Sequence, residues 1–176
     1  KLRQGSVTSE GDAIMLANKA RLAGARGQGV KVGAISDGID NRAAAQATGD
    51  LPAIITIDPA HPGDGDSGTA LLEIVHDVAP MASLYFSGPQ TSLEFIASLN
   101  YLVNTAQCDV IFDDIGFYDE PYFEDGPVAD AVQAIVGSVV YVSAAGNDHG
   151  MHYQGPYEDV SLTQSNWPYN LHKFAG

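Results

Sequence analysis

Five short apolar runs alternate along the chain with segments whose apolar residues recur at helical spacing. Each run is nearly continuous in Val, Ile, Ala or Phe, as expected of strands that are buried on both faces. Strand and helix signals that alternate at this spacing indicate crossover connections and a parallel sheet. The sequence therefore predicts an α/β fold: a doubly wound, mostly parallel sheet with helices on both faces. The predicted strands are 30–36, 53–57, 82–86, 109–113 and 139–143.

The segments between these runs carry helix start and stop signals. Thr91 and Glu94 have the spacing of a capping box, in which a hydroxyl and a carboxylate satisfy free backbone N–H groups at a helix start. Pro80 ends an earlier helical pattern because proline cannot continue a helix. The predicted helices are 12–23, one from 66 that stops before 80, one from 91 to about 105, and one from 125 or 126.

Polar residues follow the predicted strands at several points. They include 36–38 after the first strand, 113–116 after the fourth and 144–147 after the fifth. Residues 66–68 open the helix after the second strand. Ligands of doubly wound sheets bind outside the carboxyl ends of the strands, which meet at one edge. We therefore expect these four segments to converge on a site.

The charge of the 176-residue chain is strongly negative and uneven. Eight Lys and Arg against 22 Asp and Glu give a net charge of −14, which excludes a nucleic-acid-binding footprint. Residues 43–176 contain a single basic residue, Lys173. A solvated acidic surface explains this, and so does a group of carboxylates that binds a hard cation or works at low pH. No calcium-loop or metal-ligand spacing is present, so we expect no cofactor, although the carboxylates leave room for calcium.

Three further features limit the class of protein. No apolar run has the length of a membrane span. Cys108, the one cysteine, lies in an apolar run and is expected to be a buried, inert thiol. The chain begins without a methionine, and residues 151–176 show no periodicity, so we expect a fragment of a longer polypeptide. The expected division is a domain over 1–150 and an irregular segment over 151–176, the start of an insertion or a truncated end.

Four segments, in the right order, resemble the subtilisin-like serine peptidases. Residues 29–40 look like the family's aspartate segment, and 66–82 look like its histidine helix with an Ala-Pro-Met-Ala ending. Residues 110–116 resemble the strand that lines the substrate cleft, and 142–147 resemble the oxyanion segment. The resemblance covers about residues 28–148. It implies the subtilisin-like fold and a serine endopeptidase that acts on peptides or proteins.

The chain departs from this family at the reacting residues. With Gly38-Ile39-Asp40 aligned on the family's pattern, Ser36 takes the place of the catalytic aspartate and Asp37 follows one residue late. Ser67 takes the place of the histidine, and no Gly-Thr-Ser nucleophile segment is present. A bacterial branch of subtilase-like proteins resembles the chain in the Ser-Asp pair, in an acidic residue or serine instead of the histidine, and in the Glu-Ile-Val-His-Asp helix. The related sedolisins use a glutamate in place of the histidine and operate in acid.

The resemblance assigns roles to seven residues. Asp37, Ser36 and Ser67 are the candidate catalytic residues, and Asn147 is the candidate oxyanion donor. An extended peptide is expected to lie along Asp114, Ile115 and Gly116 as an added strand. The implied location is extracellular or at a bacterial cell surface, and the nucleophile is expected beyond residue 176.

Several of these side chains also have simpler interpretations. Asp37 and Asp66 are candidates for a coupled acid pair that acts as the base, yet either can serve only as a helix cap. Glu73 and Asp77 have the spacing of a solvated helix face. His76 lies too far along its helix to act at the helix start, and His61 lies in a predicted loop between prolines. No histidine is therefore expected to serve as the base.

Three functions compete. The first is part of a serine peptidase, and the second is an inactive relative that binds peptides or serves as a structural module. The third, a nucleotide- or phosphate-binding domain, is disfavoured because the chain has no Gly-x-Gly-x-x-Gly after the first strand and no phosphate-loop lysine. A receiver domain would need a lysine after the last strand, and none is there.

Overall fold

A computed structural model describes residues 7–121, 123–147, 150 and 155–156. The chain divides into two compact units, residues 1–146 and 147–176. The first unit carries every helix and strand in the described part of the chain. Most of the expected irregular segment, 151–176, lies outside the described residues, so that prediction stays open.

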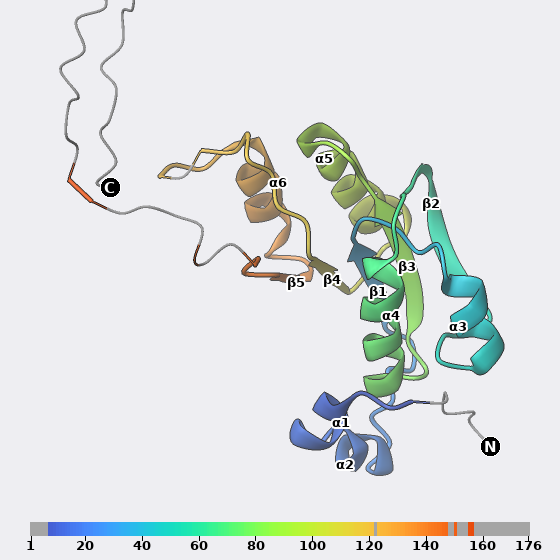
Figure 1. The fold of residues 1–176 in the computed structure, drawn as a ribbon. Coiled ribbons are helices and arrows are strands. Elements are labelled where there is room, and N and C mark those ends of the chain that lie inside the picture. The colour runs from blue at the N-terminus through green and yellow to red at the C-terminus, as the bar shows by residue number, and fades with distance from the viewer. Residues whose placement is uncertain (1–6, 122, 148–149, 151–154, 157–176) are drawn as a thin grey trace, which may run out of the picture. The chain divides into compact units, whose positions relative to one another are not determined.

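Five strands form one parallel sheet in the order β2-β3-β1-β4-β5 (Figure 1). All four strand pairs are parallel, so the predicted α/β, doubly wound fold is confirmed. The predicted strands shift by one or two residues at most ends, and the second begins later and runs further than expected. The strands are β1 (Lys31–Ile35), β2 (Ile55–Pro62), β3 (Ser83–Gly88), β4 (Val110–Asp113) and β5 (Val140–Ser143).

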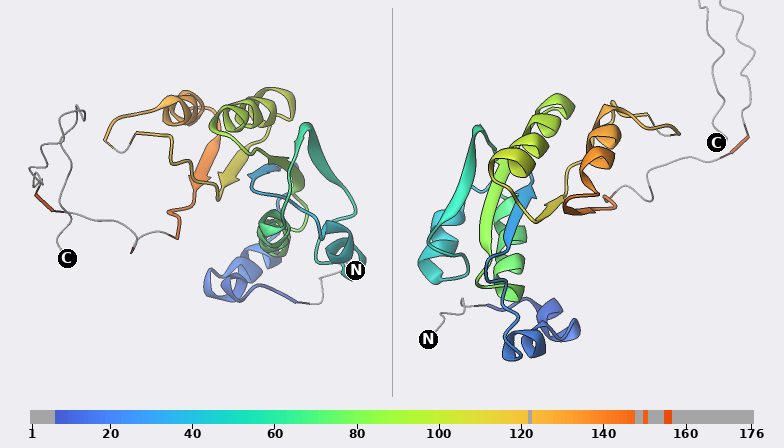
Figure 2. Two further views of the ribbon diagram at one scale, coloured as in Figure 1. Left: turned by 45° about the horizontal axis from the view of Figure 1, so that its top comes forward. Right: turned by 180° about the vertical axis from the view of Figure 1, so that it is seen from behind.

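Helices cover both faces of the sheet (Figure 2). On one face, helices α3 (Arg42–Thr48) and α4 (Ser67–Val78) pack on Val32, Ala34 and their neighbours. On the other, α5 (Ser92–Asn100) and α6 (Pro127–Ile135) pack on Ile35, Ile111 and theirs. The split follows from the strand period, because successive side chains of a strand point to opposite faces. Helix α3 is not among the predicted helices.

The predicted capping box is present at the start of α5 in a shifted form, because Glu94 bonds to the residue before the N-cap Thr91. The Thr91 hydroxyl accepts a hydrogen bond from the Glu94 N–H at 3.2 Å, and the Glu94 carboxylate accepts one from the Gln90 N–H at 2.8 Å. A π-helical turn, η1 (Tyr101–Thr105), follows α5 directly. The helical segment therefore ends at the predicted residue.

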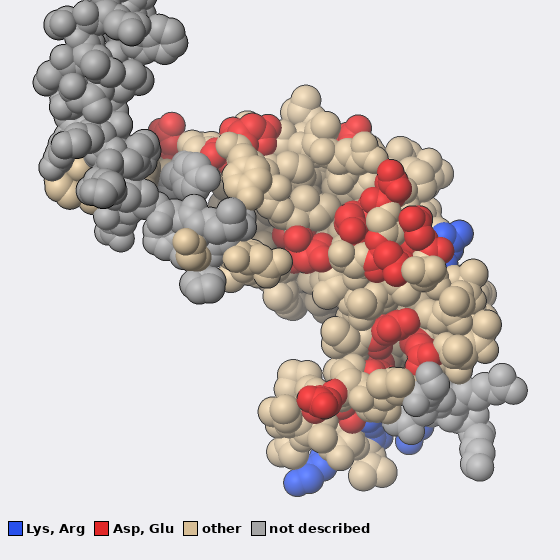
Figure 3. Space-filling view, viewed as in Figure 1, with Lys and Arg blue, Asp and Glu red and all other residues tan. Residues whose placement is uncertain are grey.

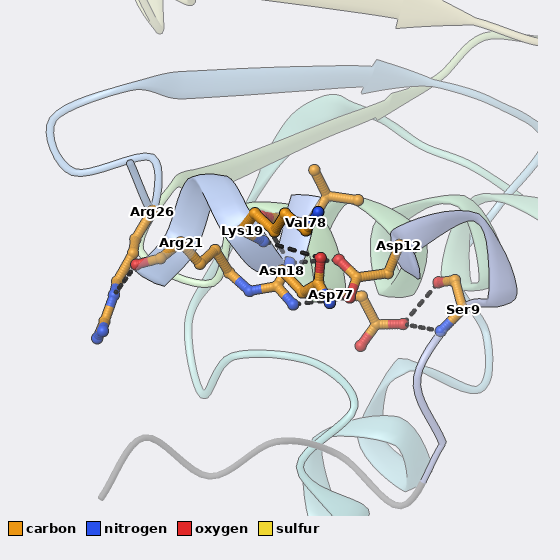
Figure 4. Close-up of polar contacts among 8 residues, drawn as sticks. All are labelled: Ser9, Asp12, Asn18, Lys19, Arg21, Arg26, Asp77 and Val78. Carbon is orange, nitrogen blue, oxygen red and sulfur yellow. Dashed lines mark hydrogen bonds and ion pairs between the residues drawn. The ribbon is translucent and has the colours of Figure 1, made fainter. Parts of the chain in front are cut away.

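The predicted helix over 12–23 is wrong, since two short helices stand there instead: α1 (Glu10–Ile14) and α2 (Ala17–Leu22). Leu16 separates them with a left-handed backbone, at φ 60°. Figure 4 shows the Arg21 guanidinium against the Asp12 carboxylate, an ion pair that holds the two helices together. In the same view, Asp77 of α4 accepts hydrogen bonds from the backbone and hydroxyl of Ser9, at 2.7 and 2.6 Å.

These contacts change the interpretation of the acidic face of α4. Asp77 is not a freely solvated carboxylate, because it fixes the N-terminal segment to the helix. Glu73 is half-buried, and burial followed by the charges of Asp50, Asp66 and Asp77 raises its pKa. Glu73 and Asp77 are therefore not the solvated helix face that their spacing predicts.

Cys108 is buried, and burial raises the pKa of its thiol to about 12, so it is the inert thiol that the sequence predicts. Within the described ranges, no helix has the length and hydropathy that a membrane crossing requires.

Candidate functional site

The ends of β1 and the start of α4 meet at the carboxyl edge of the sheet. The Asp37 carboxylate follows β1, and its Oδ1 accepts a hydrogen bond from the Ser67 backbone N–H at 2.8 Å. The Ser67 hydroxyl donates to Oδ2 of the same carboxylate at 3.1 Å. Two of the predicted catalytic residues, 30 positions apart in sequence, are therefore in direct contact.

A glycine allows this close approach. Gly65 lies beside Asp37 with φ +136°, and a Cβ at this position would stand 2.4 Å from Asp37 Oδ2. Two backbone hydrogen bonds hold the same crossing: the Asp64 N–H donates to the Asp37 carbonyl at 2.8 Å, and the Asp40 N–H donates to the Gly65 carbonyl at 3.0 Å. Any side chain at residue 65 would separate the carboxylate from α4.

The surroundings of Asp37 stabilise its charged form. Partial burial alone would raise the pKa, but hydrogen bonds from Gly38, from the hydroxyl and backbone of Ser67, and from the Gly68 backbone lower it below the usual value. The carboxylate also lies at the N-terminus of a 12-residue helix, whose dipole favours a negative charge. Asp37 therefore stays ionised further into the acidic range than an ordinary aspartate.

Asp66 does not have the role expected of it. It holds the N-cap position of α4, but its side chain accepts no hydrogen bond from the helix backbone. It accepts bonds from the backbone and side chain of Asn41, both at 2.8 Å, and from the Thr69 hydroxyl at 2.7 Å. The predicted cap is therefore wrong, because Asp37 satisfies the first backbone N–H of α4 in its place.

The prediction that Asp37 and Asp66 share a proton as a coupled acid pair is also wrong. Two carboxylates that share a proton require one raised pKa. The hydrogen bonds from Asn41 and Thr69 lower the pKa of Asp66, and the pKa of Asp37 is also lowered. Both groups are therefore carboxylates at neutral pH, each with its own set of donors.

The other two candidates are Ser36 and Asn147. Ser36 is fully buried, with its hydroxyl 3.4 Å from Asp37 Oδ1 and its backbone N–H bonded to the Ser87 carbonyl. Ser36 therefore lies on the buried side of Asp37 and has no access to solvent. Asn147 belongs to the second unit of the chain, so its part in the site stays a prediction.

A second carboxylate lies at the same edge, at the end of β4. Asp113 is 5% exposed and accepts hydrogen bonds from the hydroxyls of Tyr141 and Ser143, the second at 3.1 Å. Burial raises the pKa of Asp113 and outweighs the lowering by these donors. Burial and Asp113 likewise raise the pKa of Tyr141. Asp113 lies on the same face of the strand as Ile111, which packs with residues of α5 and α6, whereas Asp114 is exposed, as the alternation of strand residues predicts.

The predicted peptide-binding residues lie open at this edge. Asp114 and Gly116 are exposed and Ile115 is half-buried. A Cβ added at Gly116 would meet no atom within 4 Å, so the backbone there is accessible to a partner. Residues 144–146 leave β5 beside it and are also exposed. This pair of open segments suits an added strand.

A buried polar network lies on the α5 face and was missed by the sequence analysis. Asp58, only 2% exposed, accepts hydrogen bonds from His61 Nδ1 and from the Ser87 hydroxyl, both at 2.9 Å. The Ser87 hydroxyl is also 2.7 Å from that of Ser98 on α5. Burial alone would raise the pKa of Asp58, but the hydrogen bonds, led by that from His61, outweigh burial, so the pKa lies below its usual value. His61 is thus part of β2 and not of a loop, and its ring is held by Asp58.

His76 is a half-buried helix residue, and its Nδ1 has no hydrogen-bond partner among the described residues. Burial lowers its pKa, so the ring is neutral at pH 7. Among the described residues, no group of three or more His, Cys, Asp or Glu side chains is arranged to hold a metal ion.

No protein-family model matches the sequence, and the search of curated proteins also finds no match.

Proposed function

We propose that this chain is part of a serine endopeptidase of the subtilase type, with the nucleophilic serine supplied from outside these 176 residues. The observation that carries the proposal is the contact between Asp37 and Ser67. Ser67 stands at the position that the family resemblance gives to the histidine. Asp37 stands one residue after the position that it gives to the orienting aspartate. In a serine peptidase these two positions must touch, because the carboxylate orients the base.

In this proposal Asp37 is the terminal proton acceptor. The Ser67 hydroxyl donates to Asp37 and keeps lone pairs with which it can accept a hydrogen bond from the attacking serine. The proton of that serine then passes to Ser67 as the proton of Ser67 passes to Asp37. The Asn147 amide donates to the oxyanion of the tetrahedral intermediate, and the peptide lies along residues 114–116.

The lowered pKa of Asp37 has two consequences for this mechanism. The carboxylate remains ionised at pH 4 to 5, so the site works in acid, where a histidine base would be protonated. A carboxylate of low pKa is also a weak base, so the proton transfer is slower than with a histidine.

The second candidate function is an inactive relative that binds peptides or has a structural role. One observation favours it: two of the donors on Asp37 are the backbone N–H groups of Ser67 and Gly68 at the start of α4, so the carboxylate serves as a helix cap whether or not chemistry takes place.

The test is an activity assay on a polypeptide that joins this chain to its Gly-Thr-Ser segment. We expect hydrolysis of casein at pH 4 to 5, and Asp37→Asn should lower kcat/KM by at least about 100-fold. Asp40→Asn, an exposed aspartate three residues on, is the matched control and should leave kcat/KM within about twofold. The 176-residue chain alone should not hydrolyse casein.

Two results would overturn the proposal. An acidic limb near pH 7 together with an unaffected Asp37→Asn variant would mean that a histidine from elsewhere is the base. No activity at any pH, with the serine segment present, would favour the inactive, peptide-binding relative.

A further inference from the structure

A cavity of about 440 Å³ opens between α5, α6 and the ends of β4 and β5. Its volume is that of an ordinary ligand pocket. Two phenyl rings, Phe95 and Phe117, form part of the wall in an edge-to-face contact, with their centroids 5.5 Å apart. Val128 and Val132 of α6 complete an apolar surface. The cavity can therefore enclose a chain of methylene groups.

The polar lining of this cavity is acidic. Asp113 and Glu120 lie in the wall, and Glu120 accepts a hydrogen bond from the Val128 N–H at the start of α6, at 3.3 Å. Glu124 and Asp125 also line it; they are exposed and form no hydrogen bond or ion pair with any described residue. Among the described residues, the lining contains no Lys, Arg or His.

The neighbouring sequence supplies no basic side chain to neutralise these carboxylates, because no Lys or Arg occurs between Arg42 and Lys173. In Figure 3, acidic side chains spread over the upper part of the molecule, while most basic side chains lie below, near α1 and α2. A ligand with a positive charge would therefore meet an uncompensated negative field at the cavity.

A metal ion does not suit this arrangement. Calcium takes six to eight oxygen ligands around one point. The described carboxylates of the cavity do not form a group that could hold an ion. Apolar walls and spread carboxylates suit a long side chain with a charged end, because lysine and arginine bury their stems and keep the charge at a polar rim.

The cavity adjoins the segment along which the peptide is expected to lie. Ile115 belongs both to the cavity lining and to residues 114–116. A side chain projecting from a peptide paired with this segment therefore has the cavity within reach.

We infer that this cavity is a subsite for a lysine or arginine side chain of the bound peptide. The inference rests on the proposed function, since it assigns the substrate class of the same site. The stem of the side chain packs on Phe117 and on the valines of α6, Val128 and Val132. Its charged end reaches Glu124 and Asp125 at the rim.

The test measures binding of short extended peptides to the 176-residue chain by fluorescence anisotropy. One series places a single lysine at successive positions of an otherwise neutral peptide, and a second series replaces that lysine by norleucine, which has a similar stem and no charge. We expect one position at which lysine or arginine binds at least about tenfold more tightly than norleucine. Peptides of equal charge with lysine elsewhere should not show this gain.

Variants connect the preference to the cavity. The double variant Glu124→Gln/Asp125→Asn should reduce the preference to below about threefold. Glu10→Gln/Asp40→Asn removes the same charge from exposed residues outside the cavity and should keep it. Circular dichroism of both variants checks that they fold.

The outcomes separate the inference from the proposed function. If no peptide of either series binds, the proposed function itself fails. If peptides bind but norleucine binds as well as lysine, the inference is overturned and the proposed function stands. A gain that is independent of lysine position, or that survives the double variant, would mean general attraction to an acidic protein and would also overturn the inference.

Discussion

Asp37 follows β1 and Asp113 ends the neighbouring strand β4 at the same edge of the sheet, yet the two are held in opposite electrostatic states. Asp37 is exposed at the N-terminus of α4 and accepts four hydrogen bonds, so its pKa is lowered. Asp113 is buried at the end of β4 with fewer donors, so its pKa is raised. Strand position alone therefore does not determine the chemistry of a carboxylate; the helix end and the degree of burial do.

The largest effect in this comparison is expected at the glycine beside Asp37. Gly65→Ala should lower the free energy of unfolding by about 2–3 kcal/mol, because the new Cβ meets Asp37 Oδ2 at 2.4 Å on a backbone of positive φ. The matched control on the Asp113 side is Gly116→Ala, where a Cβ meets nothing within 4 Å, and its change should stay within about 0.5 kcal/mol. Urea unfolding of both variants measures this. Equal losses of unfolding free energy would mean that the contact of residue 65 with Asp37 is no closer than the surroundings of residue 116.

The next effect is the loss of the long-range cap. Asp37→Ala should cost about 1–2 kcal/mol at pH 7, because the first N–H groups of α4 lose their acceptor. The folded pKa of Asp37 is lowered, so its stabilisation is complete above the unfolded value near pH 4 and disappears as the pH falls through the folded value. The cost measured by urea unfolding should therefore shrink between pH 6 and pH 3. A cost that is independent of pH would contradict the charged state of Asp37.

A smaller effect, whose cost also grows as the pH rises, is expected at the buried carboxylate. Tyr141→Phe removes a donor from Asp113 and should cost about 1 kcal/mol at pH 7. Because the loss raises the folded pKa of Asp113 further, the cost should grow as the pH rises from 4 to 7. Tyr101→Phe, whose hydroxyl has no hydrogen bond to a described residue, is the control for ring packing, and its cost should not change over this range.

The features that could be predicted from the sequence are those with a local signal. The apolar runs were sufficient for the strands and for a parallel sheet, because a strand buried on both faces needs a continuous apolar run. The capping box of α5 is a local signal, so Thr91 and Glu94 predicted it. Each of these features is encoded within a few residues.

The features that were missed depend on contacts between distant residues or on weak local signals. Asp37 caps a helix 30 residues away, while Asp66, the local candidate, binds Asn41. The prolines around His61 indicate a loop, yet β2 is an edge strand, where proline is tolerated. Helix α3 is rich in alanine and has no apolar periodicity to predict it. The left-handed backbone of Leu16 has no glycine to signal it.

Asp37 and Asp113 are held in opposite electrostatic states at one edge of the sheet. A titration of the side-chain carboxyl resonances of the 176-residue chain by NMR measures both groups in one experiment, with Asp37→Asn and Asp113→Asn used for assignment. We expect Asp37 to titrate below the value of about 3.9 for an unperturbed aspartate and Asp113 to titrate above it. If Asp113 titrates below Asp37, the assignment of a charged cap on one side of the edge and a desolvated carboxyl group on the other is wrong.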